Sequence, residues 1–268
     1  MPDKTRLHSP DKKTIVTIDN GELISYQVDG TEVMHQKGDL GWGNTEIEMF
    51  PTIGSTKENQ FSVQTPRGEA KLDQHGILRV MDYLPITIEK SSACFHKKYI
   101  ANTQLSNHKF PNKSTQQWLN WPYDFEFIKT FELSNEALKI IFEIKSEKNM
   151  PLMLGFHPAF KIYDQNVKMK TTDRHISLDA VLKAGAPAFL LENCKEVVLT
   201  NNGNLTVTIN TNGFRHIMLW SEVTNMVCIE PITFYPASVS VDKLHTGFDY
   251  SSGYEKYEVV ISVKSNSN

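Results

Sequence analysis

Apolar residues recur along this chain mainly at every second position, in short runs that end in turn residues. This spacing is typical of strands that bury one face. Stretches with the spacing of an amphipathic helix are scarce. The clearest runs are 14–18, 23–28, 31–34, 125–133, 137–144, 197–199, 205–209 and 257–263. We therefore predict an all-β protein, a large sandwich of antiparallel sheets with few short helices.

Several of these runs are separated by turns that contain glycine. Asp19-Asn20-Gly21 lies between the first two runs, Asp29-Gly30 follows the second, and Asn201-Asn202-Gly203-Asn204 follows 197–199. Asn-Gly and Asp-Gly pairs adopt the positive φ that tight hairpin turns require. The pattern therefore predicts hairpins that connect neighbouring antiparallel strands.

The domain organisation follows from length and from the absence of internal boundaries. The chain has 268 residues, which an all-β sandwich can reach without dividing, and it shows no fixed-period repeat or Pro/Ser-rich linker. We predict one domain over residues 1–268, in which the polar residues 1–10 form a terminal extension. The polar segment 102–117 predicts a long loop with edge strands.

Composition restricts the ligand and the compartment. The formal charge of −3, from 28 Lys+Arg and 31 Asp+Glu, provides no field that would favour nucleic acid or an anionic membrane surface. Cys94, Cys194 and Cys228 are far apart, which argues against a disulfide framework or a thiolate zinc site. The N-terminus lacks a signal-peptide core, and no apolar run approaches roughly 20 residues. We expect a cytoplasmic protein with a small, neutral or weakly charged ligand.

Two segments combine histidine with residues that could form a site. In Asp-Gln-His75-Gly-Ile-Leu-Arg79, an imidazole precedes a glycine, and a guanidinium follows four residues later. A turn with a surface histidine is the alternative. In Gly-Phe156-His157-Pro-Ala-Phe160, the proline favours an extended His157, and the two phenylalanines could form apolar walls. A histidine buried between aromatic residues is the alternative there.

A third segment, Met226-Val-Cys-Ile-Glu230-Pro, ends an apolar run with a carboxylate. A carboxylate is costly to bury unless it is paired or used, so Glu230 suggests function more than any other acid in the chain. A salt bridge to a buried arginine would also explain it.

The ordered set His-Gly-x-x-Arg, Gly-x-His-Pro-x-Phe and Cys-Ile-Glu-Pro resembles the aldose 1-epimerase family, particularly its LacX-like and hexose-6-phosphate-epimerase-like branches. Residues 49–54, Met-Phe-Pro-Thr-Ile-Gly, are similar to the family's Phe-Pro-x-x-Gly segment. Residues 244–247, Leu-His-Thr-Gly, are similar to its Pro-Gly turn. The resemblance covers the chain from about residue 10 to residue 264, and it implies the galactose-mutarotase-like supersandwich with a sugar cleft.

The resemblance also implies roles for individual residues. His157 would be the general acid, Glu230 the general base, and His75 the group that binds and polarises the sugar. The substrate-binding residues that we expect besides these are Arg79, Phe156, Phe160 and Asp164, with Asp173 as an alternative to Asp164. Some positions depart from the family: Ser55 stands where many relatives have arginine, and Ile77 and Ile232 stand where aromatic residues are common.

The implied activity is that of an isomerase which interconverts the α and β anomers of an aldohexose, with or without a phosphate group, as a monomer or homodimer. A carboxylate would take the anomeric proton while an imidazolium protonates the ring oxygen. We expect an ionised Glu230 and a protonated His157, because their charges attract each other. This chemistry needs no cofactor or metal, and no Gly-rich phosphate loop or nucleophile elbow is present.

Two other interpretations remain open. One is a carbohydrate-binding protein on the same fold that does not catalyse a reaction. The other places His75, His157 and Glu230 around a metal, as in small β-barrel oxygenases. Such barrels usually supply two ligands from one His-x-His strand, which this sequence lacks.

Overall fold

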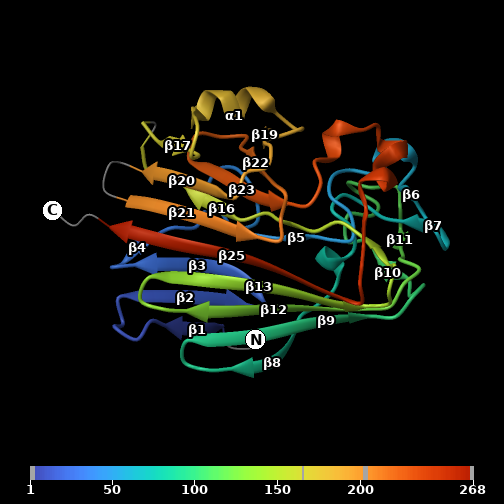
Figure 1. The fold of residues 1–268 in the computed structure, drawn as a ribbon, viewed down its shortest axis with the longest axis horizontal. Helices are drawn as coiled ribbons and strands as arrows, with labels where there is room; N and C mark the ends of the chain where they lie inside the picture. Colours follow the sequence, from blue (N-terminus) through green and yellow to red (C-terminus); the bar gives the residue numbers. More distant parts are fainter. Residues whose placement is uncertain (1–3, 165, 202–204, 266–268) are drawn as a thin grey trace.

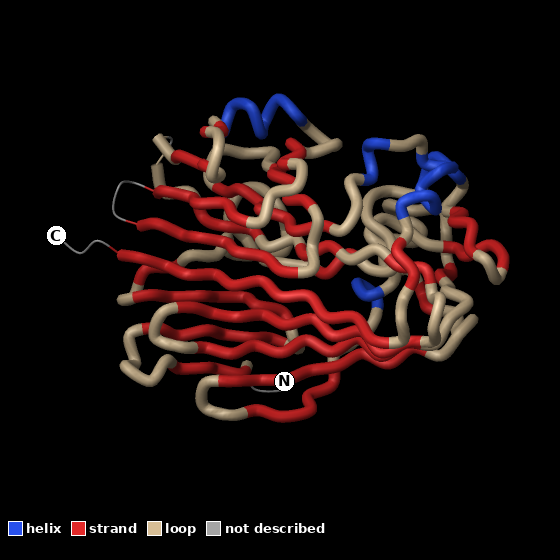
Figure 2. The backbone as a smooth tube through the Cα atoms, in the orientation of Figure 1, coloured by secondary structure: helices blue, strands red, loops and turns tan. Residues whose placement is uncertain are grey.

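The computed structural model describes residues 4–164, 166–201 and 205–265, in which antiparallel strands predominate (Figures 1 and 2). The largest sheet has nine strands. In spatial order they are β18 (His175–Ile176), β17 (Lys168–Lys170), β20 (Glu196–Asn201), β21 (Leu205–Asn212), β25 (Tyr254–Ser265), β13 (Ala137–Ser146), β12 (Phe125–Leu133), β9 (Ser92–Tyr99) and β8 (Leu84–Ile88). The prediction of an all-β sandwich of antiparallel sheets is confirmed.

A six-stranded sheet lies against the nine-stranded one. Its strands are β19 (Phe189–Leu191), β22 (His216–Trp220), β23 (Met226–Ile232), β15 (Gly155–Phe156) and β5 (Glu48–Met49), with β16 (Ala159–Lys161) also paired to β23. Between the two sheets, the rings of Phe142 and Phe156 lie 5.1 Å apart. The hydrophobic core therefore includes the space between these sheets.

The N-terminal strands form a four-stranded sheet of β1 (Thr5–His8), β2 (Thr14–Asp19), β3 (Glu22–Val28) and β4 (Thr31–Glu32). The hydroxyl of Tyr26 donates to the carbonyl of Ile261, which joins β3 to β25 of the large sheet. Three two-stranded sheets complete the strands: β6 (Ser62–Thr65) with β7 (Gly68–Lys71), β10 (Leu105–Ser106) with β11 (Trp118–Leu119), and β14 (Pro151–Leu152) with β24 (Asp249–Tyr250).

Helices are few and short. Within the described ranges, α1 (Leu178–Ala184) is the one α-helix, and it begins where the Ser177 hydroxyl accepts from the amide of Ala180. The 3₁₀ turns are η1 (Lys57–Asn59), η2 (Leu78–Val80), η3 (Pro236–Ser238) and η4 (Val241–Gly247). Across the same ranges, none of the helices has the length and apolar character needed to cross a bilayer.

The predicted strands and turns correspond closely to those observed. The run 125–133 coincides with β12, and 14–18, 137–144 and 257–263 lie within β2, β13 and β25. Asn20 and Gly21 have φ of 47° and 77°, and Asp29 and Gly30 have φ of 48° and 77°. The expected hairpin turns are thus confirmed at both places. Of the turn expected at 201–204, residues 202–204 lie outside the described part.

The expected terminal extension is wrong for part of its length. Thr5–His8 form β1, which pairs with β2, and Leu7 is fully buried. Leu7 stands between Arg6 and His8, whose side chains point to the opposite face, so a single apolar residue gave too short a pattern to be recognised. The long loop expected at 102–117 is confirmed, because β10 within it pairs with β11 just after it.

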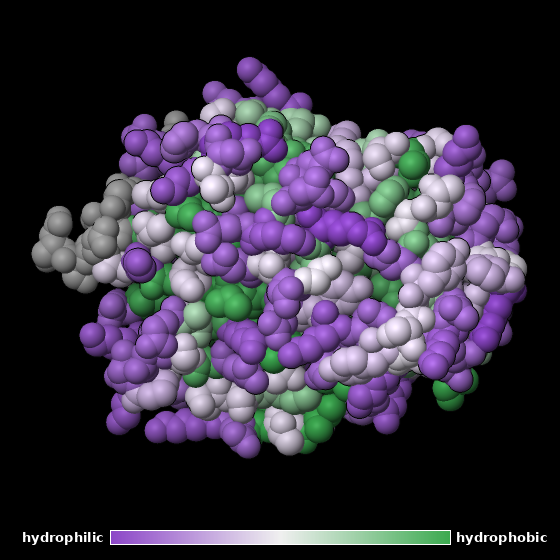
Figure 3. Space-filling model, in the orientation of Figure 1, coloured by the Kyte–Doolittle hydropathy of each residue, from purple (hydrophilic) through white to green (hydrophobic). Residues whose placement is uncertain are grey.

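On the face in Figure 3, hydrophilic residues predominate, and hydrophobic ones gather at the lower edge, over β8. Leu84, Ile86 and Ile88 of this edge strand are all exposed. β8 therefore lacks the alternation of buried and exposed residues that the core strands have.

Candidate active site

His157 lies between β15 and β16, and the residue just before β5 holds its backbone. Its amide donates to the carbonyl of Ile47 at 2.9 Å, and the amide of Ile47 donates back to the carbonyl of His157 at 3.3 Å. The following proline keeps the residue out of the helical region, as the sequence predicts. The imidazole therefore projects from a ladder of the six-stranded sheet and not from a free loop.

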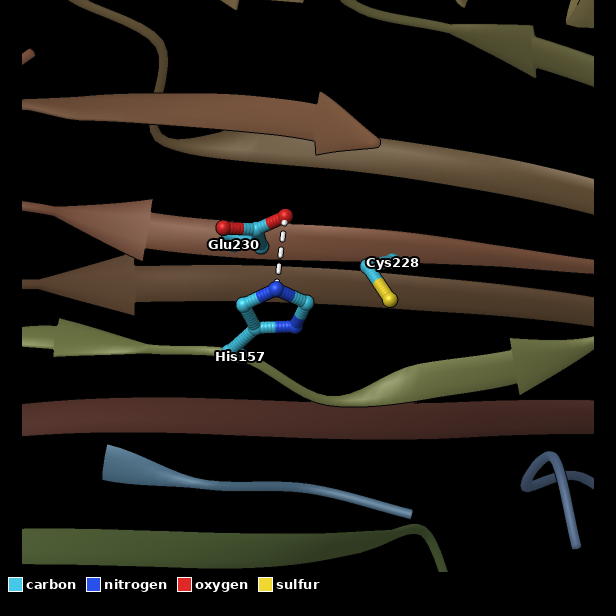
Figure 4. A group of neighbouring side chains, drawn as sticks. All are labelled: His157, Cys228 and Glu230. Atoms are coloured by element: carbon cyan, nitrogen blue, oxygen red, sulfur yellow. Dashed lines mark ion pairs between the residues drawn. The ribbon is translucent and has the colours of Figure 1, made fainter. Parts of the chain in front are cut away.

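Glu230 lies in β23, opposite Met218 of β22. The structure brings its carboxyl group to His157: Nε2 of His157 is 3.4 Å from Oε1 of Glu230 (Figure 4). Both side chains are almost fully buried, with His157 6% and Glu230 2% exposed. Nδ1 of His157 and Oε1 of Glu230 have no hydrogen-bond partner among the described residues. Buried polar atoms without partners are uncommon in proteins, and they are candidates for contact with a ligand.

His75 lies on the same side of the molecule as this pair, with its ring centre 6.0 Å from that of His157. The amide of Gly54 donates to Nδ1 of His75 at 3.2 Å. In a neutral imidazole, the hydrogen must then be on Nε2, so Nε2 is a donor. Gly76 allows this arrangement, because a Cβ there would lie 2.1 Å from the carbonyl oxygen of Phe50.

These residues line a cleft of about 570 Å³ whose aromatic walls are tryptophans. The indole of Trp42 stacks on His157 with ring centres 4.3 Å apart, and Trp220 meets the same imidazole edge-on at 5.8 Å. Phe156 and Phe160, which we expected to form these walls, lie fully buried in the core and do not line the cleft. Side chains alternate along an extended chain, so Phe156, next to His157, points to the opposite face.

Arg79 lines the cleft, as expected, and is half-buried. Its one hydrogen bond among the described residues is a long one, from Nη1 to the carbonyl of Gln74 at 3.5 Å, and it forms no salt bridge with any of them. Its charge is therefore available to a ligand.

The acids expected to hold sugar hydroxyls lie elsewhere. Asp164 accepts from the amide of Asn166, and Asp173 accepts from the hydroxyl of Thr171, both within local turns. Neither lines the cleft, so the structure does not bring Asp164 or Asp173 to the other candidate residues, and among the described residues the acid that lines the cleft besides Glu230 is Glu222. Aspartate commonly caps its own turn, which accounts for both positions.

Sequence reasoning missed Trp42, Trp220 and the segments 186–188 and 236–241, which also line the cleft. Trp42 stands between two glycines in a polar stretch, and a large aromatic residue in such a place is a signal that could have been used. Trp220 ends a strand and gives no comparable signal.

The electrostatics of the site correct one expectation. Burial lowers the pKa of His157 to about 3, and the nearby charge of Arg79 acts in the same direction. Burial raises the pKa of Glu230 well above its usual value. The cleft without ligand therefore favours a neutral imidazole beside a protonated carboxyl group, and not the expected ion pair. The two forms contain the same number of protons and differ by one transfer across the 3.4 Å contact.

His75 is affected in the same way. Its pKa lies well below the usual value, chiefly because the ring is buried and also because of His157 and Arg79. A neutral His75 agrees with the hydrogen bond that its Nδ1 accepts from Gly54.

Comparisons with known proteins agree with the fold. The protein is similar to a galactose mutarotase related enzyme from Lactobacillus acidophilus, with a TM-score of 0.79, 19% identity, and 99% and 98% of the two chains covered. It is also similar to a galactose mutarotase-like protein from Lactobacillus casei, with a TM-score of 0.75, 16% identity, and 98% and 99% covered.

Among curated proteins, the chain is similar to the chromosomal LacX protein of Lactococcus lactis, with 25% identity over 148 residues. That match spans 52% of this chain and 44% of LacX, so less than half of the curated relative is represented. The sequence profile described as Aldose 1-epimerase matches residues 21–186, which include His75 and His157 and end before Glu230. On this match, the chain belongs to the aldose 1-epimerase family.

Proposed function

We propose that this protein is an aldose 1-epimerase, an isomerase that interconverts the α and β anomers of an aldose. The observation that carries the proposal is the 3.4 Å contact between His157 and Glu230 in the wall of a cleft of about 570 Å³. A cleft of this size is within the range of small-molecule sites, and opening a pyranose requires two groups that transfer protons. Family membership supports the same conclusion.

The proton transfers balance over one cycle. The Glu230 carboxylate takes the proton of the anomeric hydroxyl while the His157 imidazolium protonates the ring oxygen, so the C1–O5 bond breaks and an aldehyde forms. The pair then consists of a carboxylic acid and a neutral imidazole, which is the form that burial favours. After rotation about C1–C2, both transfers reverse and the ring closes on the other face.

In this scheme, the bound sugar helps to produce the charged form of Glu230 and His157 that the reaction needs. Before ring opening, one proton must pass from Glu230 to His157, and this separates charge in a buried place. Sugar hydroxyls can stabilise both ions by hydrogen bonds that the free cleft does not provide. Nε2 of His75 would donate to a sugar oxygen, and Trp42 and Trp220 would pack on the apolar face of the ring.

The test is the rate of anomer exchange, followed by polarimetry of freshly dissolved sugars. We expect His157→Asn and Glu230→Gln each to lower the catalysed rate by roughly 10²–10⁴-fold. The matched control is the surface pair His96 and Glu126, whose Nδ1 and Oε1 are 2.7 Å apart. His96→Asn and Glu126→Gln should keep the wild-type rate.

If the wild type is no faster than its two site variants on aldohexoses and their 6-phosphates, the proposed catalysis is wrong. Sugar binding in that case would favour the alternative of a carbohydrate-binding protein without catalysis.

A second candidate, hexose-6-phosphate 1-epimerase, is favoured by Arg79, which lines the cleft without a salt bridge to any described residue. A guanidinium can bind a phosphate through two parallel hydrogen bonds. In that case, Arg79→Met should raise the KM for the 6-phosphate and leave the KM for the plain sugar nearly unchanged. Equal effects on both sugars would refute it.

A further inference from the structure

Cys228 is a thiol that the proposed epimerase reaction does not use. It lies two residues before Glu230 in β23, so both side chains project from the same face of the strand (Figure 4). The thiol is free and fully buried. Ligand atoms of His157, Cys228 and Glu230 all lie within 4.8 Å of one another.

Imidazole nitrogen, thiolate sulfur and carboxylate oxygen are the three kinds of atom that bind zinc in proteins. Zinc–ligand bonds of about 2.0–2.3 Å in tetrahedral geometry place neighbouring ligand atoms about 3.4–3.6 Å apart. Nε2 of His157 and Oε1 of Glu230 already have this separation, at 3.4 Å. The sulfur of Cys228 would have to approach them by about 1.4 Å at most, through rotation of its side chain.

The charges of these ligands suit a divalent cation. One thiolate and one carboxylate neutralise two positive charges, and a neutral His157 adds none. The occupied site would therefore have no net charge, which matters in a place where isolated charges are costly to bury. The thiol and carboxyl protons would be released as the ion binds.

The protein also leaves one of these ligand atoms without a partner. Oε1 of Glu230 forms no hydrogen bond with the described residues although its side chain is more than nine-tenths buried. His157 and Glu230 line the cleft, whereas Cys228 belongs to a small buried cluster next to them, against which Trp42 and Trp220 pack. An ion entering by the cleft would meet three protein ligands and keep a fourth position open to water or a sugar hydroxyl.

We infer that His157, Cys228 and Glu230 form a binding site for a thiophilic divalent cation such as Zn²⁺, and that the bound ion blocks proton transfer. The inhibition rests on the proposed function, since the ion occupies both proton-transferring groups. The binding itself does not. The competing account of Cys228 is a small buried side chain that only fills space.

Binding is tested with Cd²⁺, whose bond to a thiolate gives an ultraviolet charge-transfer band, and with Zn²⁺ by equilibrium dialysis. The wild type and the double variant Cys94→Ala/Cys194→Ala, in which Cys228 is the one remaining thiol, should each bind one ion and show the band. Cys228→Ala should lose the band and bind Zn²⁺ roughly tenfold more weakly or worse. The inference is overturned if the double variant shows no band, and this arm does not depend on the folding of Cys228→Ala.

Inhibition is measured as the ratio of each protein's anomer-exchange rate with Zn²⁺ to its own rate in chelator. We expect a ratio far below one for the wild type and near one for Cys228→Ala. If the chelated wild type is inactive while the cadmium band is present, the proposed function fails and the metal site stands. If activity is present and the double variant shows no band, the metal site fails and the proposed function stands.

Discussion

A lysine buried beneath the site offers a test of how the fold holds His157. Lys129 of β12 is fully buried between the two large sheets, where its ammonium pairs with Glu46 and lies 2.6 Å from Oε1 of Glu48. Between these two glutamates stands Ile47, whose backbone forms the two hydrogen bonds to His157. We expect Lys129→Met to disturb both stability and the site.

The expected magnitude follows from the charges that would remain. Burial, together with the charge of Glu48, raises the pKa of Glu46 to about 8 even though Lys129 opposes this, so one glutamate of the pair is largely protonated at neutral pH. Glu48 has its pKa held below the usual value by Lys129 and Lys97, against the effect of burial. Removing the ammonium leaves Glu48 without its main counter-charge. Loss of one partner from a buried pair costs about 3–5 kcal/mol.

The assay is urea denaturation followed by tryptophan fluorescence, with the free energy of unfolding extrapolated to water. The matched control is Lys139→Met, because Lys139 also faces two glutamates, Glu132 at 3.6 Å and Glu258 at 3.8 Å, but on the surface. That variant should lose less than about 1 kcal/mol. Equal losses in the two variants would refute the argument from buried charge.

Three further perturbations test separate parts of the site. Gly76→Ala should destabilise the protein far more than Gly30→Ala in urea denaturation. Both glycines have φ of 77°, but only at Gly76 would the new Cβ meet backbone, 2.1 Å from an oxygen. Equal losses of unfolding free energy in the two variants would rule out the steric argument. Because burial lowers the pKa of His157 to about 3, the unfolded chain binds a proton there that the folded chain does not, and the wild type should lose about 3 kcal/mol more than His157→Asn between about pH 7 and pH 4. Parallel curves for these two proteins would contradict the shift. Trp42→Leu removes the ring that stacks on His157 and should raise the KM for the sugar by roughly threefold to tenfold, as judged from initial rates; an unchanged KM would remove Trp42 from the sugar site.

The sequence predicted the strands in which buried and exposed residues alternate. It did not predict the strands that lack this alternation. β12 and β13 were recognised because each is long and buries every second residue over most of its length. β1 was missed because its one buried apolar residue, Leu7, has charged or polar neighbours. β8 exposes all five of its residues, so it has no buried face that periodicity could reveal.

Part of the site was predictable too, but from the family resemblance and not from the periodicity of apolar residues. His75, His157 and Glu230 belong to three separate segments, and periodicity does not reveal that these segments meet. Their convergence depends on strand pairings such as Gly155 with both Met49 and Ile232, which are tertiary facts. The family resemblance supplied the three residues as a set. It did not supply Trp42 and Trp220, which line the cleft from a loop and a strand end.

The protonation state of the pair shows where residue types alone mislead. A histidine and a glutamate in contact suggest an ion pair, and the contact alone does not set the protonation state. At His157 and Glu230, burial opposes both charges, and the 3.4 Å contact is longer than a charge-assisted hydrogen bond of about 2.7–2.9 Å. The sulfur of the buried Cys228 lies within 4.8 Å of a ligand atom of each. Because the acid and the base are neutral in the cleft without ligand, their polar atoms are available to a ligand. A bound sugar would stabilise the charged pair, and a bound cation would replace the protons.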